Sequence, residues 1–132
     1  MSLTADTNEA HQAVLDATEA ARRTLPPQRV PVRMYQTPGA LVVVAPMAAV
    51  RADDVTVELR GSNLRFFAEI RSAPERDYLL DEWDFGGYER DLEIPVGYGG
   101  GLEVALHNGQ LTIRVLPGQA SDSAVRRLKP AS

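Results

Sequence analysis

The chain has 132 residues, which is enough for one domain with short extensions and too few for two. Its net charge of −4 argues against nucleic acid as a partner, because phosphate binding needs a basic face. It contains no cysteine, which excludes disulfides, thiol nucleophiles and thiolate metal sites and suits a reducing, cytoplasmic location.

The first predicted element is a helix over residues 6–25. Asp6 or Thr7 would cap it, and Pro26-Pro27 ends it. Its apolar stripe is mostly alanine and buries little area, so we expect the N-terminal arm, residues 1–28, to be partly helical and weakly docked, or disordered. The sequence begins without a basic-then-apolar signal peptide, and its longest apolar run is too short to span a membrane.

From residue 30 onward the chain reads as a series of short strands, because apolar residues alternate with polar ones or form short apolar runs. The clearest strands span residues 30–34, 40–46, 55–60, 64–70, 88–94, 102–106 and 111–115. The unbroken Leu41-Val42-Val43-Val44 predicts a strand buried on both faces. Asn108-Gly109 is the preferred two-residue hairpin turn. Seven to nine strands without an intervening helix predict an all-β, antiparallel β-sandwich.

Residues 78–95 hold the chain's only tryptophan and a glycine pair. From Tyr88 to Ile94, Tyr, Arg, Leu and Ile alternate with Glu, Asp and Glu, which places Arg90 on the inward face of a strand. A guanidinium group cannot lose its charge in a protein. Arg90 therefore needs a carboxylate partner, for which Glu82 and Asp84 are nearest in sequence, or an edge where it reaches water.

These residues resemble the small heat-shock protein or alpha-crystallin family in its bacterial form. The similar motifs are Tyr-Leu-Leu-x-Glu at residues 78–82 and Phe-Gly-x-aromatic-x-Arg-x-Leu-x-Ile-Pro at 85–95. Residues 108–113 are similar to the family's Asn-Gly-Val-Leu-Thr-Val. Residues 47–57 are similar to the family's Leu-Pro-Gly-Val-x-x-Glu-Asp-Ile-x-Val, but Ala48-Ala49 stands in place of Pro-Gly. The resemblance implies an immunoglobulin-like alpha-crystallin domain over residues 29–118 and a flexible C-terminal tail over 119–132.

The resemblance also implies a function, that of an ATP-independent chaperone that holds partly unfolded client proteins and limits their aggregation. In the family, the loop after residue 72 carries a strand that pairs with a partner subunit, which implies a homodimer or small homo-oligomer. The implied dimer contacts are Val30, Val32, Met34, Tyr78, Leu79, Leu80, Glu82, Trp83 and Arg90. The implied client or tail groove is lined by Val55, Val57, Leu59, Leu102, Val104 and Leu106, which as apolar residues at strand spacing are equally well explained as core.

The alternative from another class is a CS-domain-like co-chaperone or interaction module that recognises one folded partner. The stretch before Gly86 favours the chaperone, since CS-type domains lack a long dimerisation loop.

No set of residues for catalysis emerges, so we predict a non-enzyme without a cofactor or a metal. His11 and His107 lie in separate elements and are interpreted as exposed polar positions. Asp81, Glu82 and Asp84 are better explained as a solvated strand edge than as a cation site. No Lys-Ser/Thr follows the glycines of residues 97–101, which favours a flexible turn over a phosphate loop.

The tail lacks the Ile-x-Ile or Ile-x-Val pair with which members of the family build large shells. Val125 and Leu128 are three residues apart, so an extended tail points them to opposite faces. The N-terminal arm is almost free of aromatic residues. We therefore expect a dimer or small oligomer, with the groove between residues 55–59 and 102–106 open or filled by another segment.

Overall fold

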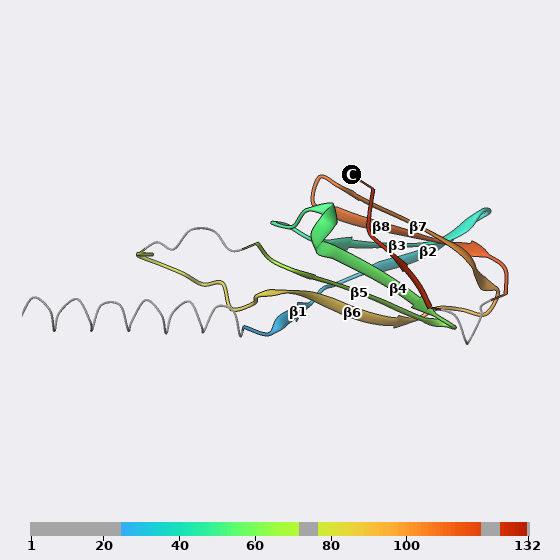
Figure 1. Ribbon diagram of the computed structural model, residues 1–132, viewed down its shortest axis with the longest axis horizontal. Coiled ribbons are helices and arrows are strands. Elements are labelled where there is room, and N and C mark those ends of the chain that lie inside the picture. The colour runs from blue at the N-terminus through green and yellow to red at the C-terminus, as the bar shows by residue number, and fades with distance from the viewer. Residues whose placement is uncertain (1–24, 72–76, 120–124, 132) are drawn as a thin grey trace, which may run out of the picture.

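The computed structural model describes residues 25–71, 77–119 and 125–131. The helix predicted over residues 6–25 falls on residues that lie, apart from Leu25, outside these ranges. Within them the chain forms strands in two layers, with a single 3-10 turn, η1 (Ala52–Asp54) (Figure 1).

The two layers are a five-stranded and a four-stranded sheet. The five-stranded sheet has the order β1 (Pro27–Arg29), β6 (Gly87–Glu93), β5 (Asn63–Glu69), β4 (Val55–Arg60) and β9 (Val125–Leu128). The four-stranded sheet has the order β2 (Arg33–Thr37), β3 (Ala40–Pro46), β8 (Gln110–Pro117) and β7 (Tyr98–His107). Among these strands β1 and β6 pair in parallel and the other pairs are antiparallel. The sandwich predicted from the spacing of the strands is confirmed.

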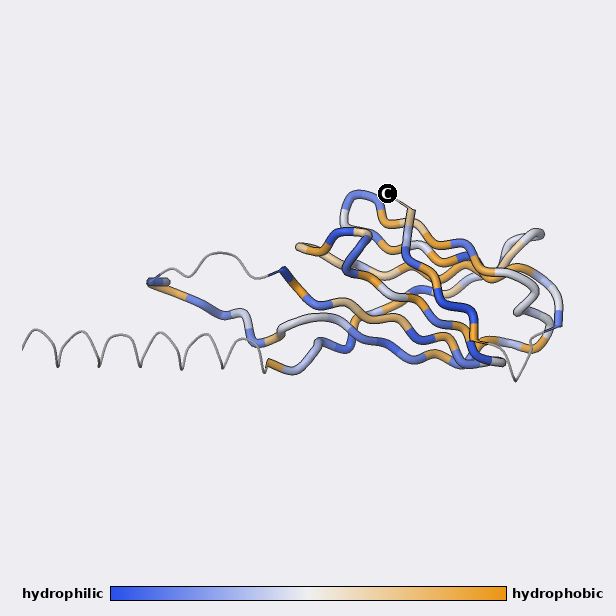
Figure 2. The backbone as a smooth tube through the Cα atoms, in the orientation of Figure 1, coloured by the Kyte–Doolittle hydropathy of each residue, from blue (hydrophilic) through white to orange (hydrophobic). Residues whose placement is uncertain are grey.

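The hydrophobic core lies between the sheets and takes every second residue of most strands, an alternation visible along the chain in Figure 2. Phe66 on β5 is fully buried, as is Val57 opposite it on β4. β3 departs from the alternation, because Leu41, Val42 and Val43 are all buried as the apolar run predicts. The outward-facing Val42 lies between Tyr35 on β2 and Arg114 on β8.

Two turns show how local sequence sets the backbone. The hairpin at Asn108-Gly109 is confirmed, with φ angles of 51° and 74°. Ala49 also has a positive φ, 63°, in the position where the similar family segment has glycine. An alanine there costs about 1–2 kcal/mol relative to its ordinary conformation. The turn is held by the Tyr88 hydroxyl, which donates to the Ala48 carbonyl at 2.8 Å.

The glycines around residue 100 do not form the flexible turn that the sequence predicts. Gly99, Gly100 and Gly101 lie within β7, and the register with β8 shifts between Tyr98 and Gly101, which marks a β-bulge. A Cβ on Gly100 would collide with the carbonyl oxygen of Pro117. Gly100 is required because two backbones approach closely here, and a Cβ on Gly101 would collide with the Leu116 side chain.

The strand predicted over residues 30–34 is divided in the structure. β1 ends at Arg29 and β2 begins at Arg33, with Pro31, which has no N–H to donate, between them. Val30 is 1% exposed and its N–H donates to the carbonyl of Glu89 at 3.2 Å. Val30 therefore belongs to the core, while Met34 stays exposed on β2.

Candidate interaction edges

β2 is an open edge of the four-stranded sheet. It pairs with β3 on one side, and no other described strand pairs with it. Residues 33–36 are exposed, including the large side chains of Met34 and Tyr35. An edge of this kind presents backbone N–H and C=O groups to which a further strand can be added.

Residues 77–86 extend away from the sandwich (Figure 1) and form no strand within the described part of the chain. Four of their large apolar side chains are exposed, namely Tyr78, Leu79, Leu80 and Trp83. Leu79 is fully exposed, at 106%. Trp83 stacks on Phe85, with their ring centroids 5.7 Å apart. The ring of Phe85 also lies against that of Tyr88, with a centroid distance of 5.8 Å. Apolar side chains gathered on one exposed segment indicate a contact surface.

Arg90 lies on the inward face of β6, as its place in the alternation predicts, because the residue opposite it on β5 is the buried Phe66. Its Nη1 donates to the Val30 carbonyl oxygen at 3.0 Å. Its Nε is buried and has no hydrogen-bond partner. Glu82 and Asp84, the nearest carboxylates in sequence, form no ion pair with it within the described ranges, so Arg90 retains a donor to offer.

The β4 edge, by contrast, is covered by the C-terminal tail of the same chain. The tail that the sequence predicts to be flexible contains β9, which pairs antiparallel with β4 from Val57 opposite Leu128 to Arg60 opposite Val125. Farther along, Ala131 reaches β7, where it accepts from Leu106 N–H and donates to the Val104 carbonyl, both at 2.9 Å. The tail, dark red in Figure 1, therefore crosses from one sheet to the other.

The six side chains predicted to line a groove are placed in or against the hydrophobic core. Val55, Val57 and Leu59 on β4 are at most 3% exposed, and Val104 and Leu106 on β7 are 9% exposed, while Leu102 is partly buried. They do not form an exposed apolar patch in this chain. The edges of β4 and β7 offer mainly backbone groups, and the tail pairs with these.

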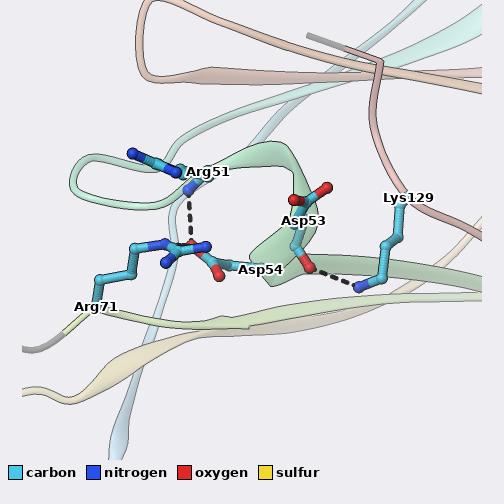
Figure 3. Close-up of polar contacts among 5 residues, drawn as sticks. All are labelled: Arg51, Asp53, Asp54, Arg71 and Lys129. Atoms are coloured by element: carbon cyan, nitrogen blue, oxygen red, sulfur yellow. Dashed lines mark hydrogen bonds and ion pairs between the residues drawn. The ribbon is translucent and has the colours of Figure 1, made fainter.

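Polar contacts fix the tail to β4 and to the turn that precedes it. Arg127 forms an ion pair with Glu58 at 2.8 Å. Lys129 donates from Nζ to the main-chain carbonyl of Asp53 at 2.7 Å (Figure 3). Neither cation was singled out from the sequence. The available signal was three cations in residues 126–129 of an acidic chain, but it does not say which carboxylates face them.

The turn that supplies the acceptor for Lys129 is itself held by a carboxylate. Asp54 accepts from the backbone N–H of Arg51 and from Nε of Arg71, both at 2.8 Å (Figure 3). These bonds, the Arg51 backbone bond first, hold the pKa of the Asp54 carboxyl below its usual value, against a smaller opposing effect of burial.

The described residues contain no group of three or more metal-ligating side chains placed to hold an ion. Asp81, Glu82 and Asp84 are exposed, and His107 is exposed at the end of β7, whereas His11 lies outside the described ranges. No helix in the described part of the chain is both long and apolar enough to cross a membrane.

A model of the Hsp20/alpha crystallin family matches residues 33–129, from β2 to the last cation of the tail. The chain belongs to the Hsp20/alpha-crystallin family. It is thus a member of the small heat-shock chaperone family, and its sandwich is an alpha-crystallin domain. The family resemblance read from residues 78–95 is confirmed. No curated protein gives a significant match to the sequence.

Solved structures support the same fold. The chain is similar to HSP18.5 from E. histolytica at 13% identity and a TM-score of 0.62, with 74% of this chain and 95% of that chain covered. It is similar to the Del-C4 mutant of hsp14.1 from Sulfolobus solfatataricus P2 at 26% identity and a TM-score of 0.61, with 70% of this chain and 79% of that chain covered. The chain is also similar to a small heat-shock protein from Xylella fastidiosa, at 18% identity and a TM-score of 0.60, with 80% of this chain and 98% of that chain covered. That crystal structure is described as revealing a distinct high order structure.

Proposed function

We propose that this alpha-crystallin-domain protein is an ATP-independent holdase, which binds partly unfolded proteins and limits their aggregation in the cytoplasm. The observation that carries the proposal is the exposed apolar segment of residues 78–83 on a domain of the small heat-shock family. Holding an unfolding chain requires accessible apolar surface and reversible contact, and it requires no energy source. The net charge of −4 makes nucleic acid an unsuitable partner.

We further propose that two copies form a homodimer by exchanging residues 79–83, each pairing with β2 of the partner subunit. The support is that β2 is open and that residues 79–83 pair with no described strand of their own chain. An isologous exchange of this kind fills both edges at once. The charges agree, since Arg33 on β2 would meet a segment that carries Asp81 and Glu82 and is followed directly by Asp84.

Arg90 gives the dimer proposal a specific contact. Its buried Nε lacks a hydrogen-bond partner, and a buried donor of this kind is rare in a completed structure. A carboxylate from the partner subunit's exchanged segment would complete it. Because pairing would also cover Leu79, Leu80 and Trp83, client capture should increase where the dimer dissociates.

The holdase proposal is tested by heating an aggregation-prone model substrate without nucleotide and recording light scattering. We expect an equimolar amount of this protein to suppress most of the scattering, with no change on adding ATP. The Leu79→Ser/Leu80→Ser variant should lose this effect. Val96→Ser is the matched control, because Val96 is fully exposed at a different turn.

Aggregation as fast as with an inert acidic protein would contradict the holdase proposal and favour recognition of a single folded partner. Light scattering of the protein alone should give a mass of a few subunits. A monodisperse particle of about twelve or more subunits would contradict the expected small assembly.

A further inference from the structure

The turn of residues 47–54 connects the two sheets, because it joins β3 of the four-stranded sheet to β4 of the five-stranded sheet. At its beginning Met47 is fully buried, and the Met47 N–H donates to the carbonyl oxygen of Gly109 at 2.7 Å. At its end the Asp54 N–H donates to the carbonyl oxygen of Arg51 at 2.9 Å within the 3-10 turn. The turn is therefore anchored on both sides, and other segments can be fixed to it.

The projecting segment, residues 77–86, is flanked in sequence by two side chains that bind this turn. Arg71, which follows β5, donates from Nε to the Asp54 carboxylate at 2.8 Å (Figure 3). Tyr88, on the paired strand β6, donates from its hydroxyl to the carbonyl oxygen of Ala48 at 2.8 Å. Contacts from the two flanks of the segment thus converge on one turn.

The Tyr88 hydroxyl supports a strained part of the turn. Ala49 has a φ of 63°, a conformation that is costly for a residue with a Cβ and that glycine adopts readily. The carbonyl that accepts the Tyr88 bond belongs to Ala48, directly before it. Tyr88 is only 6% exposed, so the core holds its ring and aims the hydroxyl. Without this hydroxyl the strained turn would lose a support.

An aromatic stack continues from Tyr88 into the projecting segment. The ring of Phe85 is tilted against that of Tyr88, and Trp83 lies nearly parallel to Phe85, with 11° between the ring planes. The stack leads outward, from the buried Tyr88 to Trp83, which is 60% exposed. Tyr88 therefore joins the projecting segment through its ring and the turn through its hydroxyl.

We propose that the turn of residues 47–54 is a clasp that holds both flanks of the projecting segment and fixes its direction, with Tyr88 and Asp54 as positioning residues for strand exchange. A segment already held in its pairing direction loses less conformational entropy on association, so the clasp favours the dimer without touching the partner. This consequence rests on the proposed dimer. The clasp itself is a property of a single chain and is tested separately.

The first test is the time-resolved fluorescence anisotropy of Trp83, the chain's only tryptophan, on protein diluted to the monomer. Tyr88→Phe removes the hydroxyl and keeps the ring, so a role in packing alone would leave Trp83 unchanged. The clasp predicts that the population with fast local motion increases by about two- to ten-fold, as expected for the loss of one neutral hydrogen bond. Tyr98→Phe is the matched control, because Tyr98 is partly buried on the other sheet, opposite Pro117.

Two further variants separate the clasp from a general loss of stability. Ala49→Gly relieves the strain, so adding it to Tyr88→Phe should restore the anisotropy decay toward that of the unaltered chain. Arg71→Gln breaks the contact at the other flank and should increase the fast motion by about two-fold, since an exposed ion pair is weaker. Arg114→Gln is its control, because the ion pair of Arg114 with Glu103 is similarly exposed and lies on the other sheet.

The second test is the dissociation constant of the dimer, measured by sedimentation velocity. Combining Tyr88→Phe with Arg71→Gln should raise it by about three- to ten-fold, because fewer chains hold the segment in its pairing direction. An unaltered chain that stays monomeric would refute strand exchange, and the anisotropy of Trp83 would still decide the clasp. Anisotropy unchanged by both single variants would overturn the clasp, and altered anisotropy with an unaltered dissociation constant would overturn its positioning role.

Discussion

The β4 edge and the β2 edge both present backbone groups to which a further strand can be added, but only the β4 edge is covered by a strand from the described residues. β4 is paired from Val57 to Arg60 with β9 of its own chain, whereas β2 presents its outer side without a strand from the described residues. The segment suited to cover β2, residues 79–83, projects away from the sandwich (Figure 1). One edge is completed within the chain, and we propose that the other is completed by a second molecule.

The composition of the two covering segments follows from this difference. A segment that stays on its own chain is present at an effective concentration on the order of millimolar, so β9 can be polar and exposed. A segment that must recruit a partner has to supply apolar area to offset the entropy of association. In the proposed exchange Leu79, Leu80 and Trp83 would supply that area, and they are more exposed than Leu128.

The largest expected effect comes from removing the segment that projects from the sandwich. Deleting residues 72–84 should convert dimers to monomers, because the strand offered to β2 is lost. Sedimentation velocity measures the change in mass. Hydrogen exchange at residues 55–60 should stay as it is, since the C-terminal tail that pairs with β4 is untouched. A deletion variant that still sediments as a dimer would refute strand exchange.

Replacing Arg90 should have the next largest effect. Arg90→Ala removes the donor to the Val30 carbonyl and, in the dimer, a partly buried charge pair, whose loss typically costs about 3–5 kcal/mol. A lower melting temperature or dissociation of the dimer is expected. Arg65→Ala is the control, because its ion pair with Asp91 is exposed and worth under about 1 kcal/mol. Equal melting curves for both variants would contradict a partly buried charge pair at Arg90.

The smallest effect is expected at Asp54, beside the covered edge. The pKa of its carboxyl in the folded protein lies below the reference value of 3.8. Between these two pKa values the unfolded state therefore binds more protons than the folded state. The carboxylate therefore stabilises the fold fully above pH 3.8, and this contribution is lost as the pH falls through the lower folded pKa.

Asp54→Asn should accordingly lower the free energy of unfolding near neutral pH, and the difference from the unaltered chain should shrink in acid. Urea unfolding at several pH values measures this. Asp91→Asn serves as an exposed carboxylate control on β6. A difference that is constant across the acid range would show that the charge of Asp54 does not contribute.

The features that the sequence predicted are those set by neighbouring residues. Asn108-Gly109 forms its turn because two adjacent residues accept positive φ. Arg90 faces inward because strand alternation places it there, and the apolar run of β3 is buried on both faces. Each follows from a few consecutive residues and the geometry of a strand.

The features that were missed depend on contacts between distant segments. Gly100 on β7 is required by the approach of Pro117, and the acceptor of Arg90 is a main-chain carbonyl, which leaves no signal in the sequence. The docking of β9 depends on a register that sets Arg127 beside Glu58. A polar, basic tail looks the same in sequence whether or not such a carboxylate faces it.

The chain contains a single tryptophan and a single lysine, Trp83 and Lys129. Trp83 lies in the segment that projects from the sandwich, and Lys129 lies in the C-terminal tail. Indole fluorescence therefore reports on one region, and acylation of the one ε-amino group reports on the other. Both regions can be followed in a single sample of the unaltered protein, which would reveal whether the surroundings of the projecting segment and of the tail change together or independently.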